Sequence, residues 1–314
     1  MGLPSIITNY KFCLDRVNDG LKDIAILGSQ GPDPFFFAAG DFKFSKNYTL
    51  FGSAMHRMDP YEMYKYMIEY ASLRVGRERD ILFSFIRGLM YHYCVDRRCH
   101  PYVFYKTGFK TEENKGKIKF GISHSALETY IDVLLSEKYD IKIKPWEALK
   151  ASDEQVQLVS VMIYKFGKNI LKDTKMDSSA YYECVKGFRR LEHMLYSPRG
   201  IKKTIYRILC RRTSLNTLCM PKEVKNNDKL DCLNEKKETW LEPDSGNKRN
   251  ESFYELLGYA SKDDDIVDEI LKDAYEGRSY QNKLKEFTSG INHHGLKEED
   301  SKKYYSLIWN KLKK

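Results

Sequence analysis

The sequence predicts an all-α fold, and two observations support this. Apolar side chains recur at the three- and four-residue spacing of amphipathic helices along most of the chain. The sequence has neither a convincing series of alternating strands nor a repeat of fixed period. The chain has 314 residues, of which 42% are hydrophobic, so it is long and apolar enough to bury a substantial core.

The helical pattern is clear at residues 61–72, where Tyr64 and Ile68 belong to an apolar stripe of three-and-four spacing. Residues 80–94 are apolar enough for a buried helix. Gly and Pro clusters at residues 28–34 and 197–200 separate helical segments. Further helices are predicted for residues 125–136, 153–171, 179–195 and 201–212.

The composition changes after Pro221. Residues 222–250 are polar and mixed in charge, which indicates a long connection, and the apolar Trp240 within them favours a pinned loop over a domain boundary. Helices are predicted again at residues 263–275 and 298–314. We therefore expect two parts in one domain: a helical domain, 1–221, and a polar connection with C-terminal helices packed on it, 222–314.

Charge and cysteine usage limit the class of protein. Lys and Arg outnumber Asp and Glu by 53 to 44, and the net charge of +9 permits attraction to phosphates or to an anionic membrane without demonstrating either. The seven cysteines show no disulfide or CxxC pattern, so we expect mostly reduced thiols. The sequence lacks a signal-peptide pattern and an apolar run of about 18 residues, which predicts a cytoplasmic protein.

Histidines and carboxylates recur at helical spacing in two clusters. In GLMYHYCVDRRCHPYVFY, His92, Asp96 and His100 are four residues apart, so they line one face of a helix. In SHSALETYID, His124 and Glu128 are one helical turn apart. Imidazole and carboxylate ligands without a cysteine set are typical of zinc or a similar divalent ion in a hydrolytic site.

Each of these signals has a simpler interpretation. A single pair at this spacing is more often a surface or capping arrangement, but two clusters together with His56 and Asp33 favour a metal site. Asp132 is interpreted as a second-layer or surface carboxylate. The adjacent His293 and His294 fall in a predicted loop and receive no role.

The order of several motifs resembles the bacterial zinc-dependent phospholipase C family. The motifs are TNYKF, LGSQGPDPFFF, FGSAMH, GLMYHYCVDRRCHPYVFY and SHSALETYIDVLL, and later LNEKKETW and PDSGNKRNESFYELL are similar to the family's intracellular-type members. The resemblance covers most of the chain. It implies an all-α phospholipase C-like domain with additional C-terminal helices, holding up to three zinc ions.

The resemblance also implies roles for individual residues. One zinc would be bound by His56, His92 and Asp96, and another by His100, His124 and Glu128. Asp96 would bridge toward a third zinc, and Asp33 would act as general base or orient the attacking water. The chain has Asn9 where the family has a histidine ligand, so we expect two zinc ions and a third site that is weak or empty.

Two zinc ions about 3.5 to 4 Å apart are sufficient to clamp a phosphodiester and activate water for attack at phosphorus. The predicted function is a zinc-dependent phosphodiester hydrolase of the phospholipase C type, acting on a phospholipid or another phosphodiester. Two alternatives stay open: a zinc nuclease-like enzyme that binds nucleic acid, and a catalytically weakened metal-binding homologue, because of Asn9. Peripheral membrane contact through the basic stretch 199–212 is a further possibility, although a helix packed on its domain is favoured there.

Overall fold

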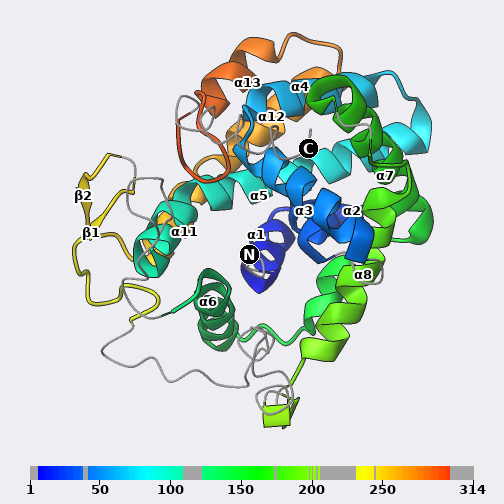
Figure 1. The fold of residues 1–314 in the computed structure, drawn as a ribbon. Coiled ribbons are helices and arrows are strands. Elements are labelled where there is room, and N and C mark those ends of the chain that lie inside the picture. Colours follow the sequence, from blue (N-terminus) through cyan, green and yellow to red (C-terminus); the bar gives the residue numbers. More distant parts are fainter. Residues whose placement is uncertain are drawn as a thin grey trace.

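The expectation of an all-α fold is confirmed. Within the described part of the chain, helices are joined by loops, and one short hairpin is the only sheet (Figure 1). No helix of this part is both long and apolar enough to cross a membrane. The computed structural model describes residues 6–37, 42–108, 122–172, 175–197, 199, 201–202, 204–205, 231–243 and 245–297.

The long helix α5, Gly76–Thr107, runs through the middle of the molecule (Figure 1). Its 32 residues correspond to a rod of about 48 Å. It ends at Gly108, which adopts the left-handed conformation and returns its N–H to the Phe104 carbonyl. The predicted helix at 80–94 is therefore part of a much longer element, which includes His92, Asp96 and His100.

The short helix α2, Lys22–Gly28, crosses α5 at unusually close range. A Cβ built on Gly88 of α5 would lie 1.8 Å from the Ala25 oxygen, and one built on Gly28 would lie 2.2 Å from the Phe85 oxygen. Only glycine allows the two backbones to approach this closely. The contact brings the end of α2 against the side of α5 that bears His92.

The remaining N-terminal elements surround α5. The helix α4 begins where Asp59 accepts a hydrogen bond from Tyr61 N at 2.9 Å and Pro60 occupies the first turn. It confirms the predicted helix at 61–72. The bounds are α1, Ile6–Leu14; the 3₁₀ turn η1, Asp33–Phe37; α3, Phe42–Arg57; and α4, Pro60–Ser72.

Three further predicted helices are present with slightly different ends. The helix α6, His124–Lys138, starts at Ser123, whose hydroxyl accepts Ala126 N. The helix α7, Asp153–Phe166, continues into the π-helical turn η3, so the predicted segment 153–171 is two elements. The other bounds are the 3₁₀ turn η2, Pro145–Leu149; η3, Gly167–Leu171; and α8, Ala180–Leu195.

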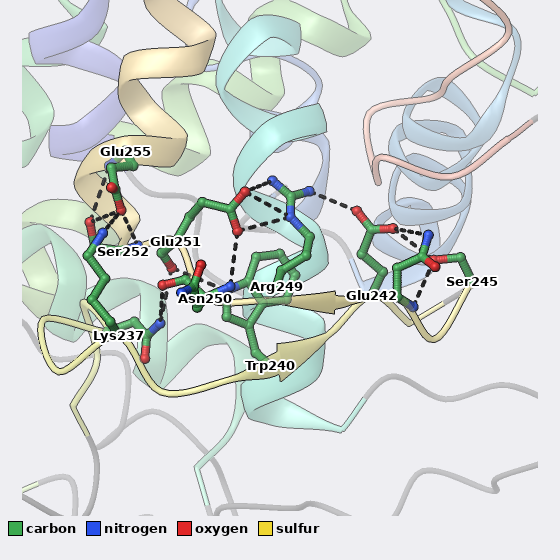
Figure 2. A network of polar contacts seen from close by, with 11 residues as sticks. Lys237, Trp240, Glu242, Ser245, Arg249, Asn250, Glu251, Ser252 and Glu255 are labelled. Atoms are coloured by element: carbon green, nitrogen blue, oxygen red, sulfur yellow. Dashed lines mark hydrogen bonds and ion pairs between the residues drawn. The ribbon is translucent and has the colours of Figure 1, made fainter.

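The polar connection contains a small hairpin, described for residues 231–243 and 245–250. Strands β1, Trp240–Leu241, and β2, Lys248–Arg249, pair antiparallel. Trp240 is 1% exposed and contacts the Tyr102 ring of α5, with centroids 5.7 Å apart. Figure 2 shows the Arg249 guanidinium between Glu242 and Glu251, at 2.8 Å from each, beside the Trp240 ring. The two-residue strands are too short to show an alternating pattern in the sequence.

The C-terminal helices pack on the same central elements. Helices α11 and α12 contact α5, and α13 contacts α4 (Figure 1). Asp263 pairs with Arg97 and Arg98 of α5 through their Nε atoms, each at 3.2 Å. The bounds are α11, Phe253–Ser261; α12, Asp264–Tyr275, which confirms the prediction at 263–275; and α13, Gln281–Thr288. The predicted helix 298–314 and most of 201–212 lie outside the described residues.

Candidate metal centre

The seven predicted site residues meet around α5. They come from four elements: η1 (Asp33), α3 (His56), α5 (His92, Asp96 and His100) and α6 (His124 and Glu128). They form two groups that could each hold a metal ion, and within a group the ligand atoms lie within 4.8 Å of one another. The first group is Asp33, His56 and His92, and the second group is His100, His124 and Glu128.

Asp96 lies between the two groups. Its Oδ2 is 2.9 Å from His92 Nε2, 3.9 Å from His56 Nε2 and 3.5 Å from His100 Nδ1. Burial alone would raise the pKa of this carboxyl, but the neighbouring imidazoles outweigh burial and hold the pKa well below its usual range. Asp96 is therefore an ionised carboxylate within reach of both groups, and its predicted assignment beside His56 and His92 is compatible with these distances.

Two buried atoms at this position have no hydrogen-bond partner among the described residues. His92 Nε2 and Asp96 Oδ2 are only 2.9 Å apart, yet they do not form a hydrogen bond of acceptable geometry. A buried polar atom left unpaired costs about 1 to 3 kcal/mol. A divalent cation between a carboxylate oxygen and an imidazole nitrogen would satisfy both atoms, so the residues fit a metal ion.

Backbone carbonyls orient three of the histidines. His56 Nδ1 donates to Gly52 O at 2.8 Å, and His92 Nδ1 donates to Ser29 O at 3.1 Å. His100 Nδ1 donates to His293 O at 2.8 Å. Because a carbonyl only accepts, each Nδ1 has a hydrogen, and Nε2 is the ring nitrogen whose lone pair would bind a metal when the imidazole is neutral.

Gly31 is required for the position of His92. It has a φ of +59°, and a Cβ built on it would lie 2.3 Å from His92 Cδ2. The turn that follows α2 therefore passes directly against the imidazole ring. Asn9 of α1, 2% exposed, also reaches this ring, with its Nδ2 3.3 Å from His92 Nδ1.

In the second group, a carboxylate lies between two imidazoles. Glu128 Oε1 is 3.0 Å from His124 Nε2 and 3.6 Å from His100 Nε2. Burial opposes a charge on His100, but Asp96 and Glu128 outweigh it and raise the pKa of His100 to about 10. Without a metal, the excess negative charge of the carboxylates is thus neutralised by a proton on His100.

Two histidines that sequence reasoning left without a role lie beside both groups. They belong to residues 291–297, which we call the histidine loop. The His293 ring is 5.6 Å from the His56 ring and 5.8 Å from the His92 ring, and the His294 ring is 5.6 Å from the His100 ring. Burial and the surrounding histidines hold the pKa of His293 and His294 well below the usual value, so both are neutral. No helical spacing in the sequence could have indicated them.

The histidine loop is tied firmly to the centre. Besides the bond from His100 to the His293 carbonyl, His293 N donates to His56 O at 3.2 Å. Inside the loop, Asn292 Oδ1 accepts His294 N at 2.9 Å. Gly295, with a φ of +71°, approaches α5 so closely that a Cβ on it would lie 2.6 Å from the Arg97 oxygen.

Asp132 is a buried anchor of α1. It accepts hydrogen bonds from Ile7 N at 2.9 Å, Thr8 N at 3.0 Å and Thr8 Oγ1 at 2.6 Å. These bonds satisfy backbone N–H groups at the beginning of α1 that have no partner within the helix. Asp132 therefore fixes the helix that bears Asn9, and the surface interpretation of this residue was wrong.

Comparisons of the chain with protein-family models, with curated proteins and with solved structures find no match.

Proposed function

We propose that the protein is a zinc-dependent phosphodiester hydrolase of the phospholipase C type. The observation that supports this most directly is the pair of ligand groups with Asp96 between them. Each group combines imidazole nitrogen with carboxylate oxygen and contains no cysteine, which is the ligand chemistry of catalytic zinc sites. Two ions held close together suit the displacement of a group at phosphorus.

The residues have separate tasks in this proposal. His56 and His92 would hold one ion, the second group would hold another, and the Asp96 carboxylate would balance part of the positive charge of both. Zinc bound at these positions would supply Lewis acidity for a phosphoryl oxygen and a lowered pKa, toward about 7, for bound water. Phe104 stacks on His100, with ring centroids 5.2 Å apart and planes at 12°, which excludes water from one face of the second group.

Asp33 has two possible tasks, and its contacts define them. Its Oδ1 is 3.3 Å from His56 Nε2, and the carboxylate is buried. As general base it would accept a proton from the attacking water, and as a ligand it would complete the first group. We favour the base, which Asp33→Asn tests: the variant keeps its zinc and loses turnover by about 10²- to 10⁴-fold. Loss of one zinc would identify a ligand instead.

The test of the whole proposal is elemental analysis of protein purified without chelators, combined with turnover of a chromogenic choline phosphodiester before and after added zinc. We expect about two zinc ions per chain, as in two-metal phosphodiesterases, and zinc-dependent turnover. Cleavage of a single-stranded oligonucleotide without turnover of the choline ester would favour the nuclease-like alternative. Zinc without either activity would favour a weakened homologue, and the absence of bound metal would refute the proposal.

The membrane part of the proposal has its own test. A phospholipid substrate is presented at a surface, and the net charge of +9 favours an anionic one. We expect the protein to sediment with vesicles of mixed neutral and anionic phospholipid at low salt, and to be released as salt screens the charges. Equal sedimentation with purely neutral vesicles would contradict an electrostatic contact.

A further inference from the structure

The His294 ring lies about as far from one histidine of each group as the two histidines within a group lie from one another. The ring centroids of His56 and His92 are 5.8 Å apart in the first group, and those of His100 and His124 are 5.6 Å apart in the second. His294 lies 5.6 Å from His100 and 5.9 Å from His56. It therefore stands beside one histidine of each group.

His294 nevertheless belongs to neither group. Within the described residues, its ring nitrogens complete neither ligand set and form no hydrogen bond with another side chain or carbonyl. The residue is partly exposed, whereas His293 beside it is 0% exposed. A polar ring next to two candidate cation sites, with no hydrogen bond to another described side chain or carbonyl, is placed to meet a ligand that ions held there would also contact.

The loop holds this ring in one place. The Tyr93 hydroxyl donates to Ile291 O at 2.7 Å, and Asn292 Oδ1 accepts both His294 N and, at 3.2 Å, Leu296 N. Phe104 meets the imidazole at nearly a right angle, with ring centroids 5.2 Å apart. Because backbone and ring are both restrained, His294 would lose little conformational freedom on binding a ligand.

We propose that His294 is a substrate-binding residue that donates an N–H hydrogen bond to the phosphoryl group lying between the two metal groups. The inference rests on the proposed function, because it requires a phosphorus substrate there. A neutral imidazole has one N–H, so no change of its charge is needed. Hydrogen bonds to a charged oxygen are stronger than neutral ones, which makes this contact a significant part of phosphate binding.

Binding of inorganic phosphate to zinc-loaded protein tests the assignment without relying on turnover. Calorimetry would compare wild type with His294→Ala and His294→Gln, and zinc content would be measured on the same samples. We expect His294→Ala to keep its zinc and to bind phosphate about tenfold or more weakly. His294→Gln retains an N–H donor and should recover part of the affinity. The control His193→Ala removes an exposed imidazole of α8 that stacks on Trp146 of η2, and it should bind phosphate like wild type.

Each result has one interpretation. Loss of zinc in His294→Ala would make His294 a metal ligand and overturn the assignment, and so would full zinc content with unchanged phosphate affinity. Wild-type protein that holds no zinc would refute the proposed function and this inference together. Wild-type protein that holds zinc but no phosphate would overturn the inference and leave a metal site of another kind.

Discussion

Replacing Gly295 by alanine tests whether the histidine loop holds His100 in its ligating orientation. The left-handed φ of +71° costs a residue with a Cβ about 1 to 2 kcal/mol. The new Cβ would also lie 2.6 Å from Arg97 O and 2.7 Å from Pro101 Cγ, and overpacking of this kind costs about 1 to 3 kcal/mol. The free energy of unfolding should therefore fall by about 2 to 5 kcal/mol, unless the loop moves away from α5.

Movement of the loop would have a measurable effect on the metal. It would lengthen the 2.8 Å bond from His100 Nδ1 to the His293 carbonyl, and the loss of such an outer contact typically weakens metal binding 10- to 100-fold. Zinc titration against a competing chelator would measure this loss, which we expect at the second group. Gly277→Ala is the matched control, because Gly277 has a φ of +74° and a Cβ there meets nothing within 4 Å. Equal zinc affinity in the two variants would refute the reasoning.

Three further predictions follow from individual residues. Because the pKa of His100 is about 10 without metal, zinc binding near neutral pH should release a proton from His100. The heat of zinc binding, measured by calorimetry in two buffers, should then depend on the buffer. A binding heat that is the same in both buffers would contradict this proton release. Burial, together with Asp132, raises the pKa of Glu192 from 4.5 to about 8, so this carboxyl's contribution to stability is present below pH 4.5 and is lost as pH rises through 8. Glu192→Gln should thus gain stability relative to wild type over that range, and urea unfolding with a constant difference at all pH values would contradict it. Gly31→Ala would place a Cβ against the His92 ring and should reduce the number of bound zinc ions by one. An unchanged zinc content in elemental analysis would show that the turn can shift to accommodate the new methyl group.

The part of the centre that lies on helices could be predicted from the sequence. His92, Asp96 and His100 share a face because the geometry of a helix is local and repeats every 3.6 residues. The same holds for His124 and Glu128 on α6. The spacing of side chains along one helix needs no knowledge of the rest of the fold.

The histidine loop could not be predicted in this way. Its position depends on α13 packing against α4 and on the contact of Gly295 with Pro101, and neither has a sequence period. The proximity of Asp33 to His56 also depends on tertiary packing, because Asp33 lies on the 3₁₀ turn η1 and His56 lies on the helix α3. Sequence patterns therefore indicated which side chains could be metal ligands, but they did not indicate the histidine loop that packs beside them.

The bond between His100 and His293 spans 193 residues, and this separation has a consequence for biosynthesis. At about 5 to 20 residues per second, a ribosome adds His293 roughly 10 to 40 seconds after His100. Once Glu128 has been added, the nascent chain has all seven predicted site residues, but until His293 follows it lacks the carbonyl that orients His100. We expect a metal ion bound before this point to exchange readily. The identity of the bound metal would therefore be determined when the histidine loop packs against the centre, and not during translation.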